Sequence, residues 1–201
     1  MSESPSSARP LSYASYLQLE KLLAAQVPES TRLGRPAHDE LLFIVVHQTY
    51  ELWFKQILHE LDAVAAILGG DFVPDRELGR AVRHLERVAS IMVLLVDQIG
   101  ILETMTPLDF LDFRHLLTPS SGFQSAQFRR IEATLGLRRA QRLAYNAQGY
   151  EASLDAGDRP VLAQLEATAS LFDRVERWLA RMPFTRFQPA GAATAPAYDF
   201  W

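Results

Sequence analysis

Hydrophobic residues recur at helical spacing along most of this 201-residue chain. No segment of useful length shows the alternation of apolar and polar residues that predicts a strand. Gly and Pro mark the boundaries, because Gly69-Gly70 and Gly136 end apolar segments and Pro74 opens one. The pattern therefore predicts an all-α fold, with helices over 13–26, 39–68, 74–99, 106–117, 124–135 and 160–182.

The predicted helices should pack as a helical, bundle-like single domain over residues 11–201, with the Ser/Pro-rich residues 1–10 disordered. The run Leu41–Val46 is hydrophobic all round, which predicts burial on every side. The helix from Pro74 should turn one stripe toward a neighbouring helix, formed by Leu78, Ala81, Val82, Leu85, Val88, Met92, Leu95, Val96 and Ile99. In the last helix the inward positions should be Val161, Leu165, Phe172, Val175 and Leu179.

Charge and composition exclude several classes of protein. Hydrophobic residues make up 48% and charged residues 22% of the chain, with a formal net charge of -4 and no long run of Lys or Arg. Nucleic acid and anionic membrane surfaces are therefore not expected as partners. The longest apolar run, Leu41–Val46, is far too short to cross a membrane.

Cysteine is absent from the chain. Its absence excludes disulfides, thiolate metal sites, a cysteine nucleophile and thiolate-ligated haem. The first ten residues are polar and lack the apolar stretch of a secretory signal. We therefore expect a cytoplasmic protein.

His47 is unusual because it lies inside an apolar segment, one turn after Phe43. Burial disfavours the charged form of histidine, so we expect a neutral ring with one donor and one acceptor. Such a ring can accept a hydrogen bond from a heterocyclic N–H or lie near a bound gas. The alternative, and the commoner case for an isolated histidine, is a core residue bonded to a backbone carbonyl.

Arg114 lies four residues after Phe110 and next to Phe113, so this helix combines aromatic rings with a fixed cation. A guanidinium in apolar surroundings suits a planar carboxylate, which it binds through two parallel hydrogen bonds. The alternative is an internal salt bridge, for example to Glu103 or Asp109. The residues alone favour neither interpretation.

A short loop, Ser120-Ser-Gly-Phe-Gln-Ser125, leads into the predicted helix over 124–135. Its N–H groups can hold an anion or a propionate, although Ser125 as an ordinary helix cap is the simpler interpretation. Asp112 and His115 have the spacing of one half of a di-iron site, but such a site needs two copies and two more Glu. We predict no metal site from these residues.

Taken together, these segments resemble the tryptophan 2,3-dioxygenase family. The matching motifs occur in the family's order: Tyr13-Ala-Ser-Tyr-Leu-Gln-Leu19, His38-Asp-Glu-Leu-Leu-Phe-Ile-Val-Val-His-Gln48, Tyr50-Glu-Leu-Trp-Phe-Lys55, Leu102-Glu-Thr-Met-Thr-Pro107, Asp109-Phe-Leu-Asp-Phe-Arg114, Ser120-Ser-Gly-Phe-Gln-Ser125 and Phe128-Arg-Arg-Ile-Glu132. The resemblance is strong from about Tyr13 to Gly136 and reappears at Val175-Glu-Arg-Trp178 and Asp199-Phe-Trp201. Long motifs in register argue against chance similarity.

The resemblance implies a site for an indole amino acid in a fold of the histidine-ligated haem dioxygenase type. His47 would be the distal histidine that hydrogen-bonds the indole nitrogen, and Phe43 would line the pocket against the haem. Arg114 would bind the amino-acid carboxylate. Phe110 would pack on the indole ring, at a position where family members often carry Tyr.

The resemblance also implies contacts with the cofactor and with a second subunit. Ser121 and Gly122 would lie over the haem edge, near bound oxygen and substrate. Tyr13, Tyr16 and Leu17 would reach into the pocket of a neighbouring subunit. A homotetramer with shared active sites is therefore implied.

By the same resemblance, the activity would be tryptophan catabolism through the kynurenine pathway. The cofactor would be haem b, and the substrates would be O2 and L-tryptophan or a close indole amino acid. Both oxygen atoms would enter the indole 2,3-bond to give N-formylkynurenine. The family's iron is held by a proximal histidine in the second half of its chain, and no histidine follows His115 here, so we assign no axial ligand.

Two alternatives stay open at this point. The chain could be a haem-free module that binds tryptophan or an indole. It could also belong to a related haem enzyme that inserts one oxygen atom into a tryptophan derivative.

Overall fold

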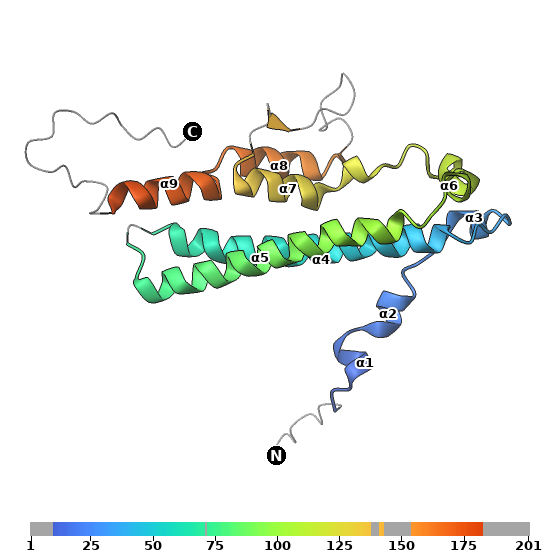
Figure 1. The fold of residues 1–201 in the computed structure, drawn as a ribbon, viewed down its shortest axis with the longest axis horizontal. Coiled ribbons are helices and arrows are strands. Elements are labelled where there is room, and N and C mark those ends of the chain that lie inside the picture. The colour runs from blue at the N-terminus through green and yellow to red at the C-terminus, as the bar shows by residue number, and fades with distance from the viewer. Residues whose placement is uncertain (1–9, 71, 138–140, 143–153, 183–201) are drawn as a thin grey trace, which may run out of the picture. The chain divides into compact units, whose positions relative to one another are not determined.

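The computed structural model describes residues 10–70, 72–137, 141–142 and 154–182 of the chain. Every regular element within these residues is a helix, so the predicted all-α fold is confirmed. Figure 1 traces the elements in chain order: α1 (Tyr13–Tyr16), α2 (Leu19–Leu23), α3 (Glu29–Arg32), α4 (Glu40–Leu68), α5 (Asp75–Leu102), α6 (Pro107–Arg114), η1 (His115–Leu117), η2 (Gly122–Gln124), α7 (Ala126–Leu135), α8 (Asp158–Glu166) and α9 (Leu171–Arg181).

The chain forms two compact units, one of residues 1–50 and 96–121 and the other of residues 51–95 and 122–201. The two long helices, α4 and α5, each contribute to both units. The prediction of a single domain over 11–201 stays a prediction. Helix α9 ends at Arg181, with Met182 as its C-cap immediately before Pro183, as predicted. Of the predicted disordered segment 1–10 all but Pro10 lies outside the described residues, as does the tail motif at 199–201.

The long helices begin and end where their local chemistry predicts. Helix α4 ends immediately before Gly69, and α5 begins immediately after Pro74. Helix α6 starts with a capping box in which the Thr106 side chain accepts from the Asp109 N–H. The Asp109 carboxylate in turn accepts from the Thr106 N–H at 3.1 Å, so two exposed donors are satisfied at once.

Helix α7 is also bounded as predicted. The Ser125 side chain accepts from the Phe128 N–H at 3.1 Å, which confirms the simpler interpretation of Ser125 as a cap. Gly136 ends the helix with φ +103, a left-handed conformation that glycine adopts without the strain of a Cβ atom.

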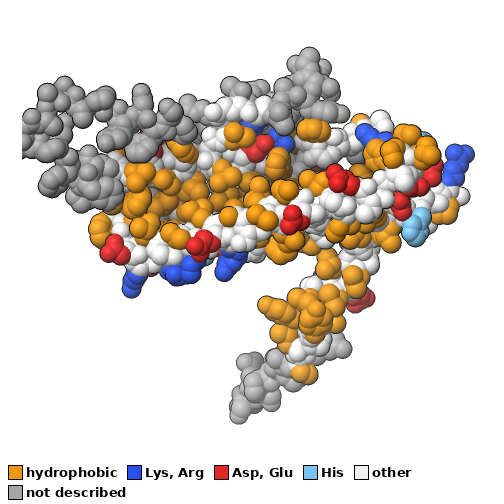
Figure 2. Space-filling view, in the orientation of Figure 1, with side chains coloured by type: hydrophobic (Ala, Val, Ile, Leu, Met, Phe, Trp, Pro, Cys, Tyr) orange, Lys and Arg blue, Asp and Glu red, His pale blue; other side chains and the backbone are white. Residues whose placement is uncertain are grey.

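The helix predicted over 13–26 is wrong, because the segment forms two short helices, α1 and α2. The break is at Gln18, whose φ of 52 and ψ of 39 are left-handed. Neither helix has a buried residue, and Figure 2 shows hydrophobic side chains gathered at the surface over this segment. Helices this short are marginal without tertiary packing, so the apolar spacing alone does not hold one continuous helix.

The single helix predicted from Pro160 is also wrong. Helix α8 ends at Glu166, and α9 restarts at Leu171 after a capping box between Ser170 and Asp173. The restart shifts the helical phase, so the predicted inward set is partly wrong: Leu162 and Leu171 are buried, whereas Val161, Phe172 and Leu179 are exposed.

Burial along the two long helices differs from the prediction. Within the run Leu41–Val46 only Val46 is buried, and Leu41 and Val45 are 48% and 40% exposed. On α5 the buried set is Ala81, Val88, Ile91 and Leu95, whereas Val82, Met92, Val96 and Ile99 of the predicted stripe are exposed. Both stretches carry apolar residues on more than one face, so periodicity alone does not identify the inward face.

Among the described residues, no single helix is long and apolar enough to cross a membrane, and only α5 with the bent continuation Pro107–Leu117 passes that test as a pair.

Candidate functional site

A cluster of three phenylalanine rings lies in the unit of residues 1–50 and 96–121. Phe43 comes from α4, and Phe110 and Phe113 come from α6. The ring centroids are 5.8 Å apart for Phe43 and Phe110, 5.6 Å for Phe43 and Phe113, and 5.5 Å for Phe110 and Phe113. These separations suit tilted and edge-to-face aromatic contacts. Phe113 is fully buried, so the cluster fixes α6 against the first turns of α4.

Arg114 follows Phe113 at the end of α6. Its Nη1 atom is buried and has no hydrogen-bond partner among the described residues. The alternative of a salt bridge to Glu103 or Asp109 is wrong, because no ion pair joins Arg114 to either carboxylate. A buried guanidinium N–H without an acceptor is costly, so this atom marks a place where an anion would be stabilised.

His47 lies one turn after Phe43, and the two ring centroids are 4.1 Å apart. Its Nδ1 atom lies 2.8 Å from the Phe43 carbonyl oxygen. A carbonyl only accepts, so Nδ1 carries a proton, and in the tautomer protonated at Nδ1 alone Nε2 is an acceptor. The carbonyl-bonded interpretation of His47 therefore agrees with the structure, and the same bond prepares the other nitrogen to receive an N–H group.

Tyr50 lies on α4 one turn beyond His47. Burial raises the pKa of the Tyr50 phenol, so this group stays neutral over the physiological range. Tyr50 therefore adds no charge beside His47.

The other predicted site residues are placed differently. Tyr13 and Tyr16 on α1 are 77% and 70% exposed, and Leu17 at its end is 40% exposed. Ser121 is half-buried at the end of its unit, and Gly122 begins η2 in the other unit. The predicted roles of all five residues stay predictions.

Two residues of this unit, Phe113 and Gln48, make contacts that were not predicted from the sequence. The contact of Phe113 with Phe110 could have been predicted from the sequence, since residues three apart are neighbours on a helix. The contacts of Gln48 could not, because its partners Ala25 and Gln26 lie in a distant part of the sequence. Only the folded chain reveals that contact.

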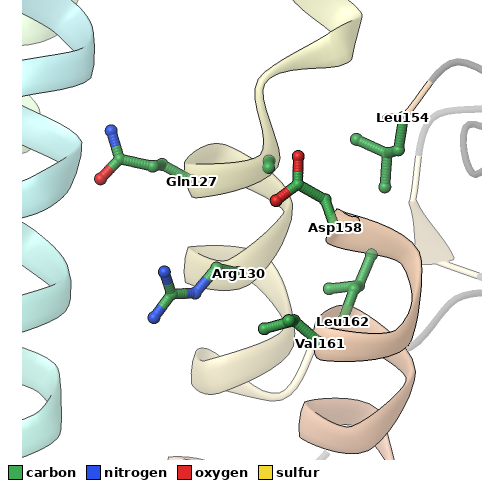
Figure 3. Close-up of a pocket in the computed structure, with 7 residues that line it drawn as sticks. Gln127, Arg130, Leu154, Asp158, Val161 and Leu162 are labelled. Atoms are coloured by element: carbon green, nitrogen blue, oxygen red, sulfur yellow. The ribbon is translucent and has the colours of Figure 1, made fainter. Parts of the chain in front are cut away.

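A hollow of about 190 Å³ lies between α7 and α8 in the other unit. Figure 3 shows Asp158 beside the apolar Leu154 and Leu162, while Arg130 points away from the carboxylate. Gln127 on its rim is bonded to the Glu51 carbonyl and carboxylate. The hollow is smaller than the roughly 300 Å³ at which ordinary ligand pockets begin, and its polar groups do not converge.

The described residues contain no group of three or more His, Cys, Asp and Glu side chains that could hold a metal ion. His84 is bonded through Nδ1 to the Glu60 carboxylate, and His47 through Nδ1 to a carbonyl. Among the described residues of this unit, Arg114 offers a buried N–H without an acceptor, and Phe43 and Phe110 offer flat apolar surfaces.

Comparison with known proteins gives matches over most of the chain. The profile of the tryptophan 2,3-dioxygenase family matches residues 2–192. A tryptophan 2,3-dioxygenase of Bdellovibrio bacteriovorus is 54% identical over 175 residues, which are 87% of this chain and 49% of that protein. The protein of the same name from Alteromonas mediterranea is 47% identical over 192 residues, 96% of this chain and 51% of its own length.

A third relative of that name, from Dictyostelium discoideum, is 48% identical over 189 residues, 94% of this chain and 45% of its own length. The chain therefore spans about half the length of the curated relatives it matches. The matches run through nearly the whole chain at high identity, and the chain belongs to the tryptophan 2,3-dioxygenase family.

Proposed function

We propose that this chain provides the substrate-binding face of a haem-dependent dioxygenase that acts on L-tryptophan. The reaction inserts both atoms of O2 into the indole 2,3-bond and gives N-formylkynurenine. The observation that carries the proposal is the buried Nη1 of Arg114, which has no partner among the described residues and follows an aromatic cluster on α6. Family membership supports the same activity.

Arg114 binds the carboxylate of the amino acid in this proposal. A guanidinium presents parallel N–H donors that match the two oxygens of a carboxylate. A ligand carboxylate would supply the acceptor that Nη1 lacks. The same side chain would reject indoles without a carboxylate, because the guanidinium would then stay unsatisfied.

His47, Phe43 and Phe110 orient the indole. Nδ1 of His47 is engaged by the Phe43 carbonyl, so Nε2 accepts the indole N–H and fixes the direction of the ring. The rings of Phe43 and Phe110, with centroids 5.8 Å apart, give the flat substrate an apolar surface. Exclusion of water there strengthens both polar contacts to the substrate.

Haem b is the proposed cofactor, and when bound it supplies the dioxygen chemistry. By the family's pattern, Phe43 would line the pocket on the substrate side, and Ser121 and Gly122 would lie at the haem edge. We assign no axial ligand to this chain.

We also propose a homotetramer with shared sites, in which α1 reaches a neighbouring copy. Tyr13 and Tyr16 are strongly exposed, and exposed aromatic side chains are typical of protein interfaces. Both would contact substrate bound to the neighbouring copy.

The role of Arg114 can be tested by calorimetry of the chain with L-tryptophan and with tryptamine, which keeps the indole and the amine but lacks the carboxylate. The parent chain should prefer L-tryptophan. Arg114→Met should weaken L-tryptophan binding by roughly 10- to 100-fold and leave tryptamine binding unchanged, because it removes charge-assisted bonds to the carboxylate alone.

Arg35→Met is the matched control, since Arg35 belongs to the same unit and is exposed; it should change neither affinity. Arg114→Lys should recover part of the preference, because an ammonium keeps the charge but not the paired geometry. No heat with millimolar L-tryptophan, or an unchanged preference in Arg114→Met, would contradict the proposal.

A further inference from the structure

Residues 11–24 contain α1 and α2, and we call this segment the apolar arm. Tyr13, Tyr16 and Leu23 of the arm are all at least 70% exposed. The side-chain hydrogen bonds between described residues of the arm are local, such as the Ser12–Ser15 capping box. Its direction must therefore be set where it joins the rest of the unit, at residues 25–30.

The first attachment is a pair of side-chain amides. Gln48 on α4 donates from Nε2 to the Ala25 carbonyl at 2.9 Å. Its Oε1 accepts from Gln26 Nε2 at 2.6 Å, and Gln26 also donates to the Leu22 carbonyl at 2.9 Å. Gln48 thus uses both ends of its amide on the base of the arm, and it directly follows His47 on α4.

The second attachment is the carboxylate of Glu40, which is 1% exposed. It accepts from the N–H groups of Glu29 at 2.7 Å and Ser30 at 2.9 Å, at the start of α3. Ser30 is itself fully buried, and its hydroxyl accepts from the Ala37 N–H at 3.0 Å. Charge-assisted bonds from backbone N–H groups are among the stronger hydrogen bonds in proteins.

The two attachments lie on one rigid helix, eight residues apart, which corresponds to a rise of about 12 Å. A segment held at a single point can pivot, whereas a segment held at two separated points has a defined direction. We infer that Gln48 and Gln26, together with Glu40, are positioning residues that fix the direction in which the arm leaves α4.

This inference rests on the proposed function only for the use of the arm, which is to bring Tyr13 and Tyr16 to the substrate of a neighbouring copy. It gives that contact between copies a mechanical basis within one chain. The helix that carries His47 also sets the direction of the arm, so each copy presents its own site and its arm in a fixed relation.

The direction of the arm can be measured directly because the chain has no cysteine. Spin labels on Ala14→Cys in the arm and Leu111→Cys on α6 would be the only labels on each chain, and an excess of unlabelled chain keeps labelled copies apart in a tetramer. Both positions are exposed, and α6 is a firm reference because Phe110 and Phe113 pack on α4. Pulsed dipolar spectroscopy then gives the distribution of label distances in the full chain.

The labelled parent should give a narrow distribution. Gln48→Leu removes both of its amide bonds to the base of the arm and should raise the ratio of detached to attached arm by about 5- to 30-fold, which broadens the distribution. Gln26→Leu leaves the Gln48–Ala25 bond and should broaden it less. Gln98→Leu is the matched control, because Gln98 bonds the neighbouring Thr49 on α4 and not the arm.

A rescue variant separates positioning from a general loss of structure. Gln26→Glu combined with Gln48→Lys lets the lysine donate both to the Ala25 carbonyl and to the new carboxylate. The narrow distribution should return and should broaden again at high salt, since an exposed ion pair is screened. Gln26→Leu lies at the edge of the unit and tests the same idea if a change at Gln48 impairs folding.

Two outcomes would overturn the inference: distributions for Gln48→Leu and Gln26→Leu that match Gln98→Leu, or a double variant as broad as Gln48→Leu. The measurement contains neither tryptophan nor haem. A failure of L-tryptophan to bind therefore contradicts the proposed function and leaves the positioning result intact. Label distances that do not change in Gln48→Leu and Gln26→Leu contradict the positioning inference and leave the proposed function intact.

Discussion

Replacing Glu60 by glutamine should destabilise the unit of residues 51–95 and 122–201 at neutral pH and should destabilise it progressively less as the pH falls below 4.5. Glu60 is 1% exposed. Its carboxylate accepts from Gln56 at 2.6 Å, from Arg87 at 2.7 Å and from His84 Nδ1. Gln56 lies on α4, whereas His84 and Arg87 lie on α5, so this one carboxylate joins the two long helices.

The magnitude follows from the pKa of Glu60. Burial raises that pKa, but the hydrogen bonds from Arg87, His84 and Gln56 outweigh burial and lower it from 4.5 to about 2. A folded pKa below the unfolded pKa stabilises the fold above pH 4.5, and the stabilisation is lost as the pH falls from 4.5 toward 2. The shift corresponds to at most about 3 kcal/mol. Arg87 is 57% exposed, so screening by solvent reduces the expected value to about 1–2 kcal/mol.

Urea unfolding followed by circular dichroism, from about pH 7 down to about pH 3, measures this difference. Glu77→Gln is the matched control, because Glu77 pairs with Arg80 on the surface of α5 at 2.9 Å and should change stability by less than about 0.5 kcal/mol. A difference between parent and Glu60→Gln that stays constant over this pH range would refute the reasoning. So would a variant as stable as the parent at neutral pH.

Two further predictions concern backbone strain and the cofactor. Gly34→Ala should cost about 1 kcal/mol in unfolding free energy, because φ is +73 but no atom lies within 4 Å of the new Cβ. Gly136→Ala should cost about 1–3 kcal/mol more, because φ is +103 and the new Cβ would lie 2.9 Å from Phe172 Cβ; equal costs in urea unfolding would contradict the role of this contact. A haem titration followed by absorbance should give no sharp, saturable Soret band for the isolated chain, and a histidine-ligated spectrum would instead place the axial ligand within it.

Sequence predicted the fold where neighbouring residues decide the structure. The start of α5 after Pro74, the capping box of Thr106 and the glycine end of α7 each depend on atoms within one helical turn. It failed where packing decides, as in the break at Gln18 and the inward face of α5. The start of α3 shows why, since the N–H of Ser30 there donates to the carboxylate of Glu40, a residue ten positions away in the next long helix.

The candidate site shows how local and distant causes combine. From the sequence alone, a salt bridge between Arg114 and Asp109 was as plausible as a ligand-binding role. In the structure, Asp109 is occupied at the start of α6, where it accepts from the Thr106 N–H and hydroxyl. The two residues are five positions apart, a spacing that does not bring side chains together on a helix. The capping box that begins α6 therefore keeps the carboxylate at one end of the helix, and the guanidinium at the other end remains available for an anion from outside the described chain.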